Sequence, residues 1–482
     1  MNNSKFLKII LIALFLFFGA SLFFRNINGD EAIIAEHSYW LQKIGYVKSE
    51  MFAGMGFGWE VKQFHYHKLF VAIGALFISI FDISLMSLRF ITLISTLIFL
   101  FTLYKYLKLK SIENKNIFLI IFLLLFTNAT FFEYAFIFRP EIMVMTLIFC
   151  SYFFLESQSK NRKLNIIIAG FLAGLATLTH LNGMISIISG LVLIILNKEY
   201  RFIIYFLIPA GCICMLYFWD ISSAENLHQF IYQFTNDPNF SKEHFRWFSP
   251  FLRLIDEHKR FFHSPKEITF SILVILSLIL NYKYFVKNHR NLLIYLLIMV
   301  LSLSILSHGK TPKYAITFYP YFSIIIAISL MRLDVLKNFK KNLVLVIAVL
   351  YFTINIVFSI LLISSSYNGV ERNSEMASKI EKNCKVMARE MFFFNEIKNF
   401  TIHIFMGYEL KSKLKNKDFS IVDLLNYCYA LNDKYIIIEN ISANQNLINL
   451  FDYDNVKINQ DFDKYKVIEK NNNYLILKKK GY

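Results

Sequence analysis

The chain is poor in charged residues, glycine, proline and cysteine. Only 18% of its 482 residues are charged and 56% are hydrophobic, whereas soluble proteins average about 25% charged and about 45–50% apolar residues. A soluble globule is therefore the poorer interpretation. Collagenous, low-complexity and disordered classes are excluded by 16 Gly and 7 Pro. The five cysteines show no metal-type spacing, and a disulfide between Cys384 and Cys428 stays open.

The positions of the basic residues argue against a nucleic-acid-binding protein. The formal net charge is +17, but most Lys and Arg fall in short links between apolar blocks. Basic links of this kind are typical of the cytoplasmic loops of membrane proteins. We therefore expect the lipid bilayer as a partner and no nucleic acid.

Apolar stretches predict a polytopic membrane protein. A bilayer-crossing helix needs about 20 mostly apolar residues. The first stretch starts like a signal peptide, but no small-residue cleavage pattern follows it, so we interpret it as an uncleaved anchor. The eleven stretches near this length lie at residues 5–24, 87–107, 117–132, 141–156, 164–180, 183–197, 201–218, 268–286, 291–307, 314–331 and 343–363. The expected fold class is all-α, with about eleven transmembrane helices.

A shorter apolar segment, residues 69–81, decides the topology. At 13 residues it favours a re-entrant or interfacial helix over a span. If it does not cross, all the basic links face the cytoplasm together with the N-terminus. The loops 25–86 and 219–267, the junction around Arg139, and the tail 364–482 then lie outside. We expect a bacterial-type plasma (inner) membrane protein with a catalytic domain at 1–363 and a small extracytoplasmic α/β domain at 364–482, closed by a hairpin at Asn471–Asn473.

The first outer loop opens with an acidic pair, Asp30 and Glu31. Apolar residues at spacings of three and four follow it and define one face of a helix that ends at Gly45. We expect this helix to lie flat on the membrane with the acidic pair at head-group depth. Asp30 can also be read simply as a helix cap. Here, however, the same loop contains His65, His67 and Lys68.

The order of these motifs resembles the GT-C superfamily of membrane glycosyltransferases, and within it the protein O-mannosyltransferases, the lipid A aminoarabinose transferases and their bacterial relatives. An Asp-Glu pair follows the first span, and a basic residue opens a short juxtamembrane helix. The match continues in FIFRPEIMVM, AGFLAGLATLTHLNG and HGKTPKYAITFYPYFSIIIA, over roughly residues 1–335. The chain departs from the family pattern in two motifs. His67, Lys68 and Leu69 stand where relatives often have Lys-Pro-Pro after an acidic residue, and His180 stands where they often have Lys.

The resemblance implies a glycosyltransferase, for hexose or pentose, that uses a polyprenyl-phosphate sugar and an unknown extracytoplasmic acceptor, which is a glycan, lipid or protein. It implies Asp30 as the general base, with Glu31 as the substitute and inversion at the anomeric carbon. For the donor phosphate it favours basic residues at the outer ends of apolar segments, although snorkelling to the interface explains them equally simply. These candidates are Lys68, Arg139, Lys310 and Lys313, of which Lys68 and Arg139 gain from the resemblance. His244 and Arg246 of the loop 219–267 are further candidates for the same phosphate. His67 and His180 are supporting candidates, and Glu141 is expected to pair with Arg139.

Several alternatives stay open. His65, His67 and His244 are candidates for a divalent metal ion, although scattered histidines are usually not ligands. The aromatic loop 219–267 either covers the site or forms an interfacial belt. A transporter or flippase is the alternative function, but its charges would lie in mid-membrane, whereas here they cluster at helix ends. A glycan polymerase or ligase with a diphosphate-linked donor is the third reading.

Overall fold

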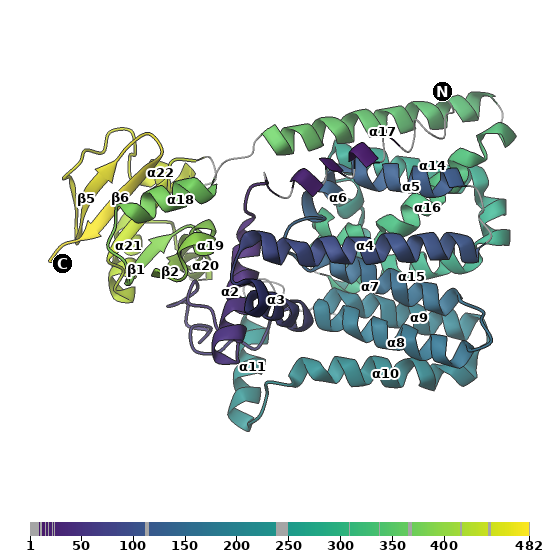
Figure 1. Ribbon diagram of the computed structural model, residues 1–482, viewed down its shortest axis with the longest axis horizontal. Coiled ribbons are helices and arrows are strands. Elements are labelled where there is room, and N and C mark those ends of the chain that lie inside the picture. The colour runs from purple at the N-terminus through teal and green to yellow at the C-terminus, as the bar shows by residue number, and fades with distance from the viewer. Residues whose placement is uncertain are drawn as a thin grey trace.

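The structure is a computed structural model in which a helical bundle carries a small sheet domain at one end (Figure 1). It describes residues 9, 12–14, 16–17, 19–21, 23, 25–110, 115–237, 249–307, 309–336, 338–364, 369–414, 417–441 and 445–481. The first predicted span and the residues His244 and Arg246 therefore fall largely or wholly outside the described part. The long helices run side by side, and the sheet lies beyond their left-hand end in the view of Figure 1.

Helices occupy every predicted span after the first. Six are long and apolar enough to cross a membrane, among the described residues, and shorter apolar helices fill the remaining stretches. The predicted span 117–132 is broken at Asn128, whose side chain caps the second piece by accepting from the Phe131 N–H at 2.9 Å. The bundle helices are α4 (Leu85–Leu109), α5 (Lys115–Thr127), α6 (Ala129–Tyr134), α7 (Glu141–Glu156), α8 (Arg162–Thr179), η1 (Leu181–Gly183), α9 (Met184–Leu196), η2 (Tyr200–Phe202), α10 (Ile203–Met215), η3 (Leu216–Phe218), α14 (Pro265–Asn288), α15 (Arg290–Leu306), η4 (Pro312–Phe318), α16 (Tyr319–Met331), η5 (Leu333–Val335) and α17 (Asn338–Ser364).

Two helices of the first loop, α2 (Gly29–Ile44) and α3 (Lys68–Phe81), lie at the end of the bundle nearest the sheet. Helix α2 runs across the long helices (Figure 1), as expected for a helix lying parallel to a membrane surface. It ends at Gly45, whose φ of 81° places it in the left-handed conformation that glycine adopts without strain. The sequence prediction of this helix and its end is confirmed. Three short helices, α11 (Ala224–Asn236), α12 (Ser249–Ile255) and α13 (His258–Phe261), follow in the second large loop.

The tail folds into a six-stranded mixed sheet with the order β2-β1-β3-β6-β5-β4. Strands β1 and β2 pair in parallel, as do β1 and β3, and the others are antiparallel. The predicted closing hairpin is confirmed, because β5 and β6 pair across Asn471–Asn473. Cys384 and Cys428 are both free. The elements are α18 (Gly369–Ser378), β1 (Cys384–Ala388), η6 (Glu390–Phe392), α19 (Phe393–Glu396), β2 (Phe400–Ile404), α20 (Phe405–Leu414), α21 (Ile421–Leu431), β3 (Tyr435–Glu439), α22 (Gln445–Leu450), β4 (Asp461–Phe462), β5 (Tyr465–Lys470) and β6 (Tyr474–Lys479).

The sheet domain and the first loop share one hydrophobic core. One face of the sheet, including Val386 and Ile402, packs in a single buried cluster with Met51, Phe52 and Trp59 of the loop. The other face packs against α20, α21 and α22. Backbone carbonyls of the loop are also bound by the domain: the Tyr427 hydroxyl donates to Ala53 at 2.5 Å and the Lys411 ammonium to Gly54 at 2.6 Å. The tail therefore holds the first loop in place.

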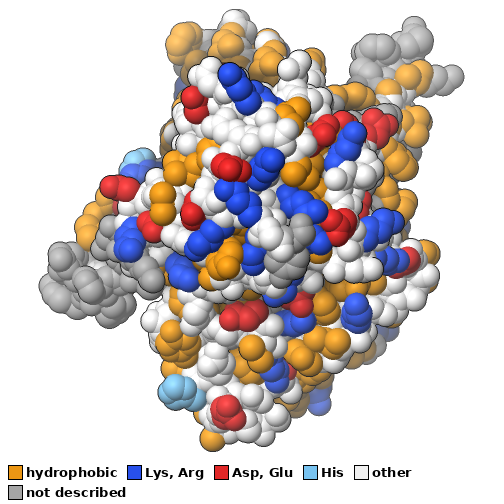
Figure 2. All heavy atoms as spheres, turned by 90° about the vertical axis from the view of Figure 1, so that its left-hand side faces the viewer, with side chains coloured by type: hydrophobic (Ala, Val, Ile, Leu, Met, Phe, Trp, Pro, Cys, Tyr) orange, Lys and Arg blue, Asp and Glu red, His pale blue; other side chains and the backbone are white. Residues whose placement is uncertain are grey.

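The face that carries the sheet domain is polar. Figure 2 shows Lys and Arg side chains interspersed with Asp and Glu over this side of the molecule. By contrast, large apolar side chains are exposed along the bundle helices, for example Phe101 on α4 and Ile279 on α14, at 63% and 67% exposure. Exposed apolar side chains on long apolar helices are expected where lipid replaces water. The site candidates of the first loop therefore lie where the apolar bundle meets the polar end.

Candidate active site

Asp30 stands at the start of α2 with its carboxylate directed toward two cations. The helix is capped by Asn28, not by Asp30: the Asn28 side chain accepts from the Asp30 N–H at 3.0 Å, and the Glu31 carboxylate accepts from the Asn28 N–H at 2.9 Å. This capping box leaves the Asp30 side chain free for other partners. It forms an ion pair with Arg139 and lies 3.7 Å from the Lys313 ammonium. Since 44% of the side chain is exposed, the carboxylate remains accessible.

Arg139 is oriented by Glu141. The guanidinium donates through Nη2 to the Glu141 carboxylate at 2.7 Å and through Nε at 3.2 and 3.3 Å. Both side chains are buried. Pro140 separates them at the start of α7, where its fixed φ suits the helix start. Glu141 therefore occupies one edge of the guanidinium as expected, and the Nη1 atom faces Asp30.

Glu31 is buried in an ion pair with Arg89 of α4. The carboxylate accepts from Arg89 at 2.7 and 2.8 Å and from the Phe138 N–H at 2.7 Å. The two side chains are 0% and 1% exposed. A carboxylate that has neither access to solvent nor a free oxygen is poorly suited to take a proton from a substrate. We therefore replace the predicted catalytic role of Glu31 with a structural one, which is to join α2, α4 and the residues before α7.

Lys68 opens α3 and binds Asp220, a residue that follows η3. The ammonium lies 2.7 and 2.8 Å from the two carboxylate oxygens, and the Tyr66 hydroxyl donates to the same carboxylate at 3.2 Å. Lys68 also lies 3.9 Å from the centre of the Tyr66 ring, a cation–π geometry. Burial lowers the pKa of Lys68 to about 8, although Asp220 opposes the shift. Lys68 is thus a cation that desolvation has made easier to deprotonate.

Three of the histidines that the sequence singled out, His65, His67 and His180, lie near one another in the described part of the chain. The rings of His67 and His180 stack at a centroid distance of 4.8 Å, and His65 Nδ1 lies 3.0 Å from the Tyr217 hydroxyl. Burial lowers the pKa of His67 well below its ordinary value, and that of His65 is lowered too. Within the described ranges, no group of three His, Cys, Asp or Glu side chains could hold a metal ion. The third metal candidate, His244, lies outside the described residues.

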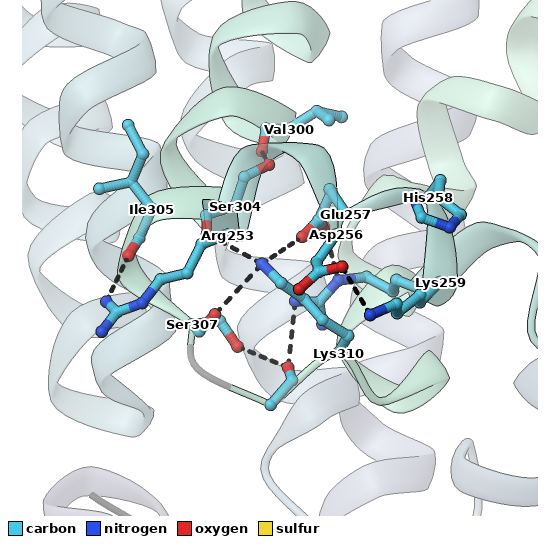
Figure 3. Close-up of polar contacts among 12 residues, drawn as sticks. Arg253, Asp256, Glu257, His258, Lys259, Val300, Ser304, Ile305, Ser307 and Lys310 are labelled. Atoms are coloured by element: carbon cyan, nitrogen blue, oxygen red, sulfur yellow. Dashed lines mark hydrogen bonds and ion pairs between the residues drawn. The ribbon is translucent and has the colours of Figure 1, made fainter. Parts of the chain in front are cut away.

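Lys310 lies in a cluster of polar contacts with Glu257 and Ser304 (Figure 3). Its ammonium donates to Glu257 at 2.8 Å and to the Ser304 carbonyl at 2.9 Å. Glu257 also accepts from the fully buried Arg260 at 2.6 Å, and Arg260 donates to the carbonyls of Gly309 and Thr311. In the described part of the chain, these contacts of Lys310 and Arg260 hold in place the segment that leads to Lys313. Lys310, predicted as a phosphate ligand, thus has a structural partner in Glu257.

The sequence and the fold are similar to those of known proteins. Residues 69–219 match the family model for dolichyl-phosphate-mannose-protein mannosyltransferase. The structure of ArnT from Cupriavidus metallidurans bound to undecaprenyl phosphate superposes with a TM-score of 0.61, at 12% identity over 98% of both chains. The chain has the GT-C fold. AglB from Archaeoglobus fulgidus, in complex with an inhibitory peptide and a dolichol-phosphate, superposes with a TM-score of 0.51 at 12% identity, covering 86% of this chain and 66% of that one. No curated protein matches the sequence.

The structure brings together Asp30, Arg139 and Lys313, which the sequence had singled out. Sequence reasoning missed Arg89, Asp220 and Glu257, the partners of Glu31, Lys68 and Lys310. Arg89 carried a signal that could have been used, because an arginine inside a predicted span is costly in lipid and needs a partner. Asp220 and Glu257 had no such signal in the sequence, because both lie in a loop that is rich in charged residues. Glu36 was missed as well: its buried carboxylate accepts from Ser49 and from the backbone of Glu50 and Met51, and so fixes the loop after α2 of the GT-C fold.

Proposed function

We propose that the protein transfers a sugar from a polyprenyl-phosphate donor to an acceptor outside the cytoplasm, with Asp30 as general base. One observation supports this most strongly: Asp30 is accessible to solvent and lies between Arg139 and Lys313 at the end of the bundle. A base and two cations within reach of one another are what this reaction needs. The GT-C fold, seen in ArnT with undecaprenyl phosphate and in AglB with a dolichol-phosphate, supports the choice of donor.

In the proposed reaction an acceptor hydroxyl oxygen attacks the anomeric carbon. The bond from this carbon to the phosphate oxygen breaks, and the electron pair leaves with the polyprenyl phosphate. The hydroxyl proton passes to the Asp30 carboxylate, so atoms and charge balance. Because there is one displacement, the anomeric configuration inverts. Phosphate is a good leaving group once its charge is held, so the step requires no general acid, unlike hydrolysis of a glycoside.

The charge that develops on the leaving phosphate is matched by fixed cations. Arg139 is held by Glu141 along one edge and Lys313 lies beside it, so neither needs to reorganise as the charge appears. Lys68 is buried against Asp220 and supplies a third candidate. In this proposal the hydrocarbon chain follows the apolar surface of the bundle, and the sheet domain supports the first loop near the acceptor. His244 and Arg246 stay candidates for the same phosphate.

The test is turnover by the purified protein with a panel of polyprenyl-phosphate sugars, with release of the lipid phosphate as the readout. Asp30→Asn is expected to lower turnover by about 10²–10⁴-fold, the usual contribution of a general base. Asp82→Asn is the matched control, since Asp82 is an exposed carboxylate of the same loop that pairs with Lys398. Equal turnover by Asp30→Asn and wild type would remove Asp30 as the base. Release only from diphosphate-linked sugars would overturn the donor class.

A further inference from the structure

A polar cavity lies at the end of the bundle opposite Asp30. It has a volume of about 190 Å³ and is lined by Lys110, Glu156, Lys287, His289, Arg290 and Asn291. Helix α7 links the two ends, because it begins next to Arg139 and ends at Glu156. At a rise of about 1.5 Å per residue, this helix separates them by roughly 20 Å. The cavity is therefore distinct from the proposed glycosyl-transfer site.

The negative charge in this cavity is already neutralised. One oxygen of Glu156 pairs with Lys110 and the other accepts from Asn291 at 2.8 Å. Glu156 is buried, at 4% exposure. Lys287 and Arg290 line the cavity in addition to this pair, so the lining carries two uncompensated positive charges. Such a cavity favours an anion.

His289 and the start of α15 add hydrogen-bond donors. His289 is 8% exposed and lines the cavity. In the described part of the chain its ring contacts Tyr284 and Phe285 and has no hydrogen-bond partner. His289 is also the N-cap residue of the 17-residue helix α15, and no side chain caps that helix end. The first N–H groups of an uncapped helix and its dipole favour an anion such as phosphate.

The surroundings of the cavity indicate a lipid as the source of this anion. The cavity is lined by the ends of four helices. Lys110 directly follows α4, and the other lining residues lie at the ends of α7 and α14 and at the start of α15. On the last turns of α14, just before Lys287 in the chain, Tyr282 and Val286 are exposed at 64% and 40%. A cavity at the ends of long apolar helices lies at the depth of lipid head groups. Basic pockets between such helices are known to take anionic head groups.

We propose that this cavity binds the phosphate of an anionic phospholipid head group. Arg290 and Lys287 contact the phosphate oxygens, His289 and the first amides of α15 donate to them, and the acyl chains lie along α14. The site is a lipid-binding site independent of catalysis.

The test is binding of phosphatidylglycerol to the delipidated full-length protein, counted by native mass spectrometry, with phosphatidylcholine as the neutral comparison. The variant Lys287→Gln/Arg290→Gln is expected to bind phosphatidylglycerol about tenfold to thirtyfold more weakly than wild type, from roughly 1 kcal/mol per basic residue near a membrane surface. Both side chains are exposed, so the variant should fold. Lys108→Gln/Lys283→Gln is the matched control, because these two lysines lie on α4 and α14 at the same end but do not line the cavity.

Retained binding by the control together with weakened binding by the cavity variant supports the proposal. Equal affinity for the two lipids, or equal loss in both variants, would overturn it. A third arm replaces the lipid with inorganic phosphate and measures thermal unfolding. If millimolar phosphate stabilises wild type as much as phosphatidylglycerol does, and the cavity variant loses both effects, the site takes a free anion and the lipid assignment is wrong.

Discussion

Replacing Glu31 with Gln should destabilise the protein, whereas replacing its neighbour Asp30 with Asn should not. Glu31 is fully buried and accepts two hydrogen bonds from Arg89 and one each from the N–H groups of Asn28 and Phe138. A neutral amide leaves the Arg89 charge buried without compensation. Breaking a buried ion pair by removing one partner costs about 3–5 kcal/mol. Asp30 is 44% exposed, and exposed pairs contribute about 0–1 kcal/mol.

The assay is thermal unfolding of the detergent-solubilised protein, followed by the loss of monodisperse material on gel filtration. We expect Glu31→Gln to lower the midpoint by several degrees and Asp30→Asn to leave it within a degree or two. The double variant Glu31→Gln/Arg89→Met should recover part of the loss, because no buried charge is then unpaired. The reasoning is refuted if Glu31→Gln unfolds like wild type but has lost all turnover, since Glu31 would then act on substrate and not on Arg89.

Three further predictions concern pH and topology. If the Lys68 charge holds the donor phosphate, kcat/KM should fall as the pH rises through about 8, where burial has placed the Lys68 pKa, and Lys68→Arg, which stays charged, should remove this alkaline limb. Burial raises the pKa of Glu36 from 4.5 to about 7, so over this range the native state keeps a proton that the unfolded state has lost. The free energy of unfolding should therefore fall by about 3 kcal/mol as the pH rises from about 4.5 to 7. Glu36→Gln should make the unfolding midpoint nearly constant over that range, and an equal slope in variant and wild type would contradict the prediction. Reporters fused after residues 84 and 110 and at the C-terminus should be outside, inside and outside, and a cytoplasmic C-terminus would overturn the predicted orientation.

The features that the sequence predicted correctly depend on local pattern. Apolar runs placed the bundle helices, spacings of three and four placed α2, and Gly45 marked its end. The hairpin at Asn471–Asn473 was also local. The sequence failed where one residue changed a local pattern: Asn128 breaks an apolar run by capping a new helix.

Two partners of the site residues, Arg89 and Asp220, could not be predicted because they are distant in the chain from the residues they bind. Arg89 lies 58 residues from Glu31, and Asp220 lies 152 residues from Lys68. Spacing in a sequence reports which residues share a helix face, but it does not report which helices meet. The prediction therefore listed cations at helix ends without being able to separate Lys313, which faces Asp30, from Lys310, which binds Glu257.

The pairing pattern itself argues for Asp30 as the reactive carboxylate. Around this end of the bundle the carboxylates of Glu31, Glu141, Asp220 and Glu257 are each buried against a basic side chain. Each of them is held in place and shielded from any acceptor. Asp30 contacts Arg139 through the outer edge of a guanidinium that Glu141 already neutralises, and it remains 44% exposed. A phosphate that approaches Arg139 and Lys313 would compete with Asp30 for these cations. The ion pairs of Asp30 would then be weaker, so its carboxylate would accept a proton more readily once the donor is bound.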